Sequence, residues 1–361
     1  MVSEVELATR LVFIDTCAYE SKNFNFGIDS LGRIQEFIEY DKIHLLLPEI
    51  IKSEIEKHIR IKSESIANIL KKTSKERDLK MLTVATDLPC VTVLTPPTPE
   101  EIYQNIHDKF LEFINFTNVE IVSVDDVNPK IVFDNYFESR PPFSNPKKKC
   151  EFPDAFVLEA INQISKNRKH AIYVISPDND MKLYAENHDN MIHLNTVNEL
   201  ISLIIHNDSE LAEPANFADQ IFEYLKEEII KNAETILYES EFIATQFSEY
   251  LYDDIISNIS IDIFEISEKN LQEVSRVESL FQVSFDVTLT VDFSIPDYES
   301  SPWDQEDKRY VFINTERFSK QYKEKYSSHI TLSYEDGIKK NAEIIDFTFD
   351  DKVFELNQSL N

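Results

Sequence analysis

Four short, mostly apolar runs within the first 206 residues constrain the fold more than any other feature of the sequence. None of them alternates apolar with polar residues, so none resembles a strand that has one face in water. Helical patterns follow each run, and strands that helices cover on both faces have this composition. The runs are residues 11–14, 45–47, 171–175 and 191–194. They predict an α/β domain over residues 1–206, with a parallel sheet flanked by helices.

A change of pattern after residue 206 predicts a second domain over residues 207–361. Segment 206–214 is polar and ends in proline, which is typical of a linker. A helical stretch at 217–256 follows, and β-branched residues alternate with polar ones from residue 257 onward. We therefore expect a smaller α+β domain in which a long helix precedes an antiparallel sheet. Segment 96–142 of the first domain is predicted to be an insertion that caps one end of the parallel sheet.

The glycine and cysteine counts exclude several classes of protein. The chain has three glycines and therefore no glycine-rich phosphate loop or dinucleotide fingerprint, which excludes protein kinases, Walker-type ATPases and Rossmann dehydrogenases. The three cysteines are far apart, which excludes a disulfide scaffold and favours a reducing cytoplasm. No apolar run reaches the ~20 residues of a membrane span. We expect a cytoplasmic protein without membrane contact.

The formal charge of −30 is unevenly distributed along the chain. Residues 207–361 carry a net charge of −21, whereas residues 1–206 carry −9. Within the first domain, segment 57–80 has eight basic residues against three acidic ones. A second basic group consists of Arg140, Lys147, Lys148 and Lys149. The first domain is therefore suited to face a polyanion, and the acidic second domain is a better candidate for contact with a protein partner.

Acidic residues follow the predicted strands or begin the helices after them. Asp15 directly follows the first strand, and Asp178 and Asp180 follow the third in the sequence Ser-Pro-Asp-Asn-Asp. Each of these residues alone fits a helix cap or a turn. Glu54 and Asp154 instead lie on the apolar faces of their helices. A bare carboxylate there would cost several kcal/mol, so each needs a partner, and an ion pair with Arg or Lys is the simple alternative for Glu54.

The carboxyl ends of parallel strands meet at one edge of a sheet, so these carboxylates are expected to converge. Two like charges at ~4 Å repel by roughly 4 kcal/mol at an effective dielectric of about 20. A divalent cation offsets this repulsion, and oxygen ligands without His or Cys select Mg²⁺ or Mn²⁺. Such an ion polarises a phosphate and activates an attacking water. The pattern therefore predicts metal-dependent hydrolysis of phosphodiester bonds.

This set of motifs resembles that of PIN-domain nucleases, and most closely that of the larger bacterial PIN-like proteins with extra domains. The resemblance covers about residues 10–206 and includes the acid after the first strand, the helix that starts at Pro48, and the sequences Phe-Pro-Asp-Ala and Ser-Pro-Asp-Asn-Asp. It implies metal-dependent RNA cleavage by an acidic tetrad of Asp15, Glu54, Asp154 and Asp178. It also implies auxiliary roles for Asp180, as a further metal ligand, and for the Ser176 hydroxyl.

The resemblance has further implications and two departures. A basic approach like that of Arg140, Lys147, Lys148 and Lys149 precedes the Asp154 helix in the larger members, so these residues are expected to hold the RNA backbone. Toxin and defence roles also occur among such proteins. The separation of 100 residues between Glu54 and Asp154 exceeds that of compact toxin-type members. Cys17 stands where many members have Asn, and the adjacent carboxylate is expected to raise the pKa of its thiol rather than activate it.

Two alternatives to an endoribonuclease stay open at this stage. The first is a catalytically silent PIN-like module that regulates or binds proteins, although the complete tetrad favours an enzyme. The second is a nuclease that acts on DNA, because no feature of the sequence recognises a 2′-hydroxyl. The sequence also leaves open the nucleic-acid target, the biological trigger, the choice between one and two metal ions, and the oligomeric state.

Overall fold

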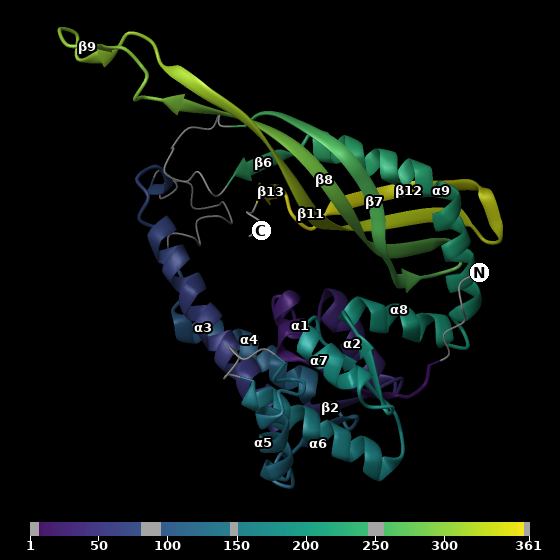
Figure 1. Cartoon of the computed structure of the whole chain (residues 1–361). Helices are drawn as coiled ribbons and strands as arrows, with labels where there is room; N and C mark the ends of the chain where they lie inside the picture. The colour runs from purple at the N-terminus through teal and green to yellow at the C-terminus, as the bar shows by residue number, and fades with distance from the viewer. Residues whose placement is uncertain (1–6, 81–94, 145–150, 245–255, 357–361) are drawn as a thin grey trace. The chain divides into compact units, whose positions relative to one another are not determined.

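The computed structural model describes residues 7–80, 95–144, 151–244 and 256–356 of the chain (Figure 1). These residues belong to two compact units, Met1–Ile204 and Ile205–Asn361. Among the helices in these ranges, none has the length and apolar character needed to cross a membrane.

A parallel sheet of five strands forms the centre of the first unit, with the order β3-β2-β1-β4-β5. Its strands are β1 (Leu11–Ile14), β2 (His44–Pro48), β3 (Val119–Val122), β4 (Ile172–Ile175) and β5 (Met191–Leu194). All four residues of β4 are buried, as are three of the four in β1. The predicted parallel sheet is confirmed, and β1 occupies its middle position between β2 and β4.

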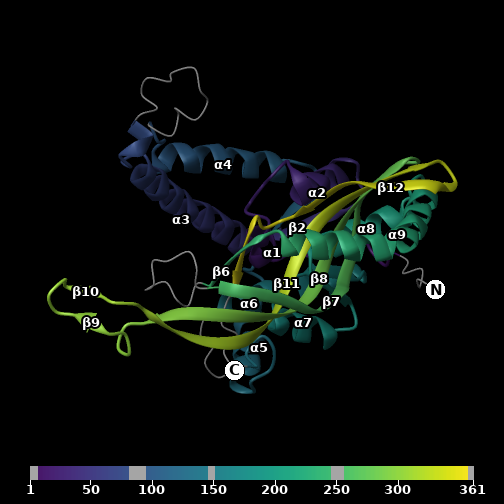
Figure 2. The ribbon, with the colours of Figure 1, turned by 90° about the horizontal axis from the view of Figure 1, so that it is seen from above.

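Helices connect and flank these strands: α1 (Thr16–Ser21), α2 (Asp29–Glu39), α3 (Glu49–Thr73), α4 (Pro99–Ile114), α5 (Pro129–Phe137), α6 (Phe152–Arg168), α7 (Asn179–Glu186) and α8 (Val197–Asn207). Helix α3 begins directly after Pro48 and ends with Lys71 and Lys72 in its last turn, where positive charge complements the helix dipole. The long helices α3 and α4 lie side by side (Figure 2).

Segment 96–142 differs from the prediction that it only caps the sheet. Between α4 and α5 it supplies the edge strand β3, which pairs in parallel with β2. The sequence of β3 is Val-Glu-Ile-Val, so a charged residue interrupts the apolar run that would have marked a strand. At the sheet edge that residue, Glu120, is paired: Arg168 donates to its carboxylate at 2.6 and 2.8 Å, and His44 lies 3.1 Å away.

The second unit contains an antiparallel sheet with the order β12-β11-β8-β7, which confirms the predicted sheet class. Its elements are α9 (Ala212–Tyr238), β6 (Glu241–Ala244), β7 (Ile256–Val274), β8 (Glu278–Asp297), β11 (Asn314–Glu335), β12 (Ile338–Phe349) and β13 (Val353–Leu356). Phe222 of α9 packs on Phe281 of the sheet, with 4.9 Å between the ring centroids. The helix ends before the predicted residue 256, because residues 241–244 pair with β13.

Strands β8 and β11 form a hairpin that is longer than the sequence pattern predicts. They pair from Asn314 with Asp297 to Ser333 with Glu278. The short strands β9 (Trp303–Asp304) and β10 (Arg309–Tyr310) lie at the far end of this hairpin (Figures 1 and 2). The first half of β11 is mostly exposed, so its polar sequence lacks the alternation that identifies a strand with one buried face.

Candidate active site

Asp15 lies at the carboxyl end of the central strand β1 and is only 3% exposed. Its backbone N–H donates to the Ile175 carbonyl at 3.0 Å, which joins the ends of β1 and β4. One carboxylate oxygen accepts from the Thr16 N–H at 2.7 Å and thereby caps α1. The other accepts from the Ser176 hydroxyl at 2.9 Å. Donors from two neighbouring chain segments therefore fix the orientation of this carboxylate.

The turn after β4 holds the predicted residues Ser176, Asp178 and Asp180. The buried Ser176 hydroxyl, besides donating to Asp15, accepts from the Asp178 N–H at 3.0 Å. Asp178 caps α7, and its carboxylate accepts from the Asp180 N–H at 2.6 Å. Asp180 is buried in the first turn of that helix. Ser176 thus links the Asp178 turn to Asp15, and its hydroxyl positions the carboxylate of Asp15.

Glu54 approaches the same carboxyl edge from α3. The Thr16 hydroxyl donates to its Oε2 at 2.9 Å, which connects Glu54 to the residue directly after Asp15. The sequence left open that Glu54 only forms an ion pair with Arg or Lys. Among the described residues, no Lys or Arg forms such a pair with Glu54. Thr16 was not singled out from the sequence as a site residue. Its only signal was a hydroxyl in the first turn of the helix that Asp15 caps.

Asp154 lies in the first turn of α6 and is partly buried. Its pKa is raised to about 8, mainly by burial and then by a hydrogen bond with the Glu151 side chain and the charges of Asp15, Glu151 and Glu54. Glu151 was not predicted as a site residue. It precedes the helix by one residue, where an acid is ordinarily explained by the helix dipole.

The pKa of Asp15 also shows that the acids lie within range of one another. This pKa is about 6, because burial raises it more than the hydrogen bonds from Ser176 and Thr16 lower it, and the charges of Glu54 and Asp178 contribute to the rise. The charges of Asp15 and Glu54 in turn raise the pKa of Asp154. The four acids that the sequence analysis grouped therefore influence each other electrostatically at one edge of the sheet.

The donor set of this edge fits a divalent cation, although it is not arranged as a finished site. Over the described ranges no three His, Cys, Asp or Glu side chains are gathered closely enough to hold a metal ion. The acids at the edge nonetheless offer only oxygen ligands, which Mg²⁺ and Mn²⁺ prefer. A positive ion among them would favour the ionised forms that burial and mutual repulsion now disfavour.

The predicted basic residues have different surroundings. Arg140 is exposed and forms an ion pair with Glu138, whereas Lys147, Lys148 and Lys149 lie outside the described residues. In segment 57–80, two basic side chains pair with acids from other helices: Arg60 with Glu100 at 3.1 Å and Lys62 with Glu20 at 3.1 Å. Part of the positive charge of that segment is therefore already compensated.

Cys17 is exposed at the site, and we expect it to be unreactive toward alkylation. Burial of the thiol sulfur, followed by the charge of Asp15 and a hydrogen bond to it, raises the pKa of Cys17 to about 12. Its thiolate population at pH 7.5 should be roughly a thousandfold lower than that of a free cysteine. Iodoacetamide labelling, followed by mass spectrometry of the Cys17 peptide, measures this. Asp15→Asn should speed the labelling, and a wild-type rate equal to that of a model peptide would contradict the assignment.

The comparison with known proteins agrees with this geometry. A family model of the PIN domain matches residues 12–181, from β1 into α7, and this span includes all four acids of the predicted tetrad. No curated protein and no solved structure matches the chain. PIN domains are generally nucleases, which usually use divalent metals. Residues 12–181 of the first unit therefore form a PIN domain, and an additional C-terminal region follows that unit.

Proposed function

We propose that the first unit is a metal-dependent endoribonuclease that hydrolyses phosphodiester bonds. The observation that carries this proposal is the buried carboxylate of Asp15 at the carboxyl end of β1, which Ser176 and Thr16 hold in place and which Thr16 links to Glu54. Buried acids that repel one another are unfavourable for the fold alone, and such clusters are typical of functional sites. The match to the PIN domain, a nuclease-type fold, supports the same conclusion.

In this proposal Asp15, Glu54, Asp154 and Asp178 hold Mg²⁺ or Mn²⁺, with Asp180 as a further ligand. The ion, when bound, polarises the scissile phosphate and lowers the pKa of the attacking water. Within the chain, the Ser176 and Thr16 donors orient the carboxylate of Asp15. Asp154, whose pKa is about 8, carries a proton at neutral pH that leaves when positive charge arrives.

The RNA backbone would be held by positive charge around the site. The proposal assigns this role to Arg140, to Lys147, Lys148 and Lys149, and to the basic segment 57–80. Binding through phosphate contacts should weaken steeply with salt. The choice of RNA over DNA comes from the family resemblance, so the test must include both.

The test uses the purified full chain, Mn²⁺, and end-labelled RNA, single-stranded DNA and duplex DNA. We expect internal cleavage of RNA that EDTA stops, in which water attacks the phosphorus and the 3′-oxygen leaves, so that one product carries a 5′-phosphate and the other a 3′-hydroxyl. Cleavage of DNA alone would identify a deoxyribonuclease. Binding without cleavage of any substrate would favour the catalytically silent module.

The two halves of the chain should differ in their contribution to activity. A fragment of residues 1–210 contains the proposed acids, the parallel sheet and α8, so we expect it to fold and to cleave RNA at least as fast as the full chain. Residues 207–361 carry a net charge of −21 and should show no RNA affinity at about 150 mM salt. Circular dichroism measures the folding of the fragment, the cleavage assay its activity, and filter binding the RNA affinity of the second half. Micromolar RNA binding by the second half, or a folded but inactive fragment, would contradict this division.

A further inference from the structure

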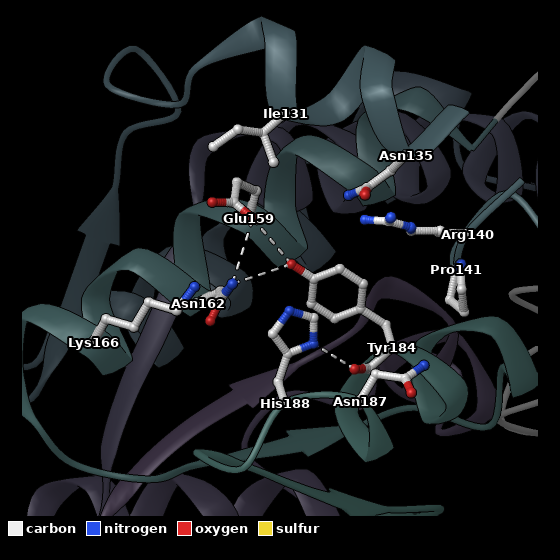
Figure 3. Close-up of a pocket in the computed structure, with 10 residues that line it drawn as sticks. All are labelled: Ile131, Asn135, Arg140, Pro141, Glu159, Asn162, Lys166, Tyr184, Asn187 and His188. Carbon is white, nitrogen blue, oxygen red and sulfur yellow. Dashed lines mark hydrogen bonds between the residues drawn. The ribbon is translucent and has the colours of Figure 1, made fainter. Parts of the chain in front are cut away.

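A cavity of about 500 Å³ lies among α5, α6 and α7 of the first unit (Figure 3). Its lining includes Glu159 from α6 and Tyr184 from α7, and it contains none of the acids of the candidate active site. Glu159 follows Asp154 by five residues on α6, which places it about 7.5 Å further along the helix and on a different face. The helices that carry the acids therefore also form a second, separate site.

Glu159 is a buried carboxylate, 6% exposed, and its hydrogen-bond partners among the described residues are all neutral. The Tyr184 hydroxyl donates to it at 3.1 Å and the Asn162 amide at 3.4 Å (Figure 3). The Gln163 amide also donates to it at 3.4 Å, so both amide hydrogen bonds are longer than usual. In the described ranges no Lys, Arg or His forms an ion pair with it. A carboxylate accepts about four hydrogen bonds. Glu159 therefore has acceptor capacity for a ligand that brings donors.

The chemistry of the bases selects one such ligand. Guanine presents two adjacent donors, N1–H and the N2 amino group, and one carboxylate can accept from both. Adenine and cytosine place a ring acceptor beside their amino group, and uracil places carbonyls on both sides of its N–H. A carboxylate repels each of these acceptors. A buried acid whose acceptor capacity is only partly used discriminates against a ligand that places an acceptor beside it.

The other walls of the cavity suit an aromatic ring with a phosphate. The rings of Tyr184 and His188 are stacked on each other, at 21° with centroids 4.2 Å apart, and Tyr184 is buried. The outer face of the half-buried His188 ring is therefore the surface of this pair on which a base can stack. Arg140 and Lys166 also line the cavity, and their positive charge opposes a cationic ligand and favours an anionic group. A free guanidinium or ammonium compound therefore fits the cavity less well than a nucleotide.

Exposed aromatic residues lie on α5, which also forms part of the cavity wall. Phe137 is 76% exposed, and its ring lies nearly parallel to that of Phe133, with 6.4 Å between the centroids. Bases of a single strand stack on such rings. We propose that the cavity binds a guanine base together with its phosphate, with Glu159 accepting from N1–H and the N2 amino group. This proposal goes beyond the nuclease activity and does not depend on it.

The test is calorimetric titration of the full chain in EDTA with 5′-GMP, 5′-IMP and 5′-AMP. Inosine lacks only the 2-amino group, and we expect GMP to bind about tenfold or more tightly than either competitor. Glu159→Gln should weaken GMP binding by about tenfold or more and remove the preference. Glu186→Gln, an exposed acid on α7, is the matched control and should leave the affinity unchanged. Asp15→Asn should also bind GMP normally, which separates this result from a failure of the nuclease proposal.

Two further measurements show whether the ligand is a base of an RNA strand or a free nucleotide, and whether Lys166 contacts its phosphate. A short RNA with one guanine that binds more tightly than GMP would identify the base of an RNA strand as the ligand, and weaker binding would identify the free nucleotide. Lys166→Gln should reduce the difference between GMP and guanosine. Equal affinities for the three nucleotides, or no binding, would overturn the proposal, as would unchanged GMP affinity in Glu159→Gln. If that variant does not fold, the comparison of GMP with IMP in the wild type decides.

Discussion

Asp154→Asn should lower the rate of RNA cleavage by on the order of a hundredfold or more while the circular dichroism spectrum stays native. The substitution is nearly isosteric, and it removes a charge from the carboxyl edge of the sheet without emptying space in the core. Because the pKa of Asp154 is raised to about 8 by burial and neighbouring acids, an amide is easily accommodated there in the metal-free state. Single-turnover cleavage with saturating Mn²⁺ measures the rate.

A matched pair on α3 controls for the loss of charge itself. Glu49 is exposed in the first turn of this helix, and Glu54 accepts the hydrogen bond from Thr16 at the site. Glu54→Gln should reduce the rate strongly, whereas Glu49→Gln should cleave at the wild-type rate. Equal rates for the two variants would exclude Glu54 from the site.

Asp15→Asn should stabilise the metal-free protein, by an amount that depends on pH. Its pKa is about 6 in the folded chain against 3.8 as the ordinary value, so the folded state binds the proton more tightly. The cost of ionising Asp15 is absent below pH 3.8, develops as the pH rises, and is complete above about 6. The variant should therefore gain up to about 3 kcal/mol in the free energy of unfolding near pH 7, and almost nothing at pH 4.

Urea unfolding in EDTA at pH 4 and pH 7 measures this difference. Addition of Mn²⁺ should then raise the stability of the wild type more than that of Asp15→Asn, because the ion binds the ionised acids of the folded state. A variant that is less stable than the wild type at pH 7 would show that the hydrogen bonds of Asp15 outweigh its burial. Equal stabilisation of both proteins by Mn²⁺ would exclude Asp15 as a ligand.

The central part of the fold could be predicted because its strands are buried on both faces. An unbroken run such as that of β4 has few alternative structures, and the acids follow directly where the strands end. Strand β3 could not be recognised in the same way, since Glu120 interrupts its apolar run and is paired with Arg168 from α6 and with His44 from β2. The order of the strands and the pairing of residues far apart in the sequence depend on tertiary contacts, which a local sequence pattern does not contain.

The candidate site was predictable to a similar extent. The four acids are each marked by a strand end or an apolar helix face, whereas Thr16 and Glu151 act through single hydrogen bonds that sequence spacing does not show. The cavity around Glu159 was not predicted at all, since its members come from separate helices. On α6 alone, Glu159 resembles any acid of a long helix, and only the packing of Tyr184 against it shows that it is buried.

The central claim is that the acids at the carboxyl edge of the sheet act as one metal-dependent site. A double-mutant cycle on the single-turnover rate of Mn²⁺-dependent RNA cleavage tests it most directly, with Asp15→Asn, Asp154→Asn and the double variant. Groups that act as a unit are strongly non-additive, so the double variant should be no slower than the slower single variant. If both single variants and the double variant cleave at the wild-type rate, these acids are not the active site.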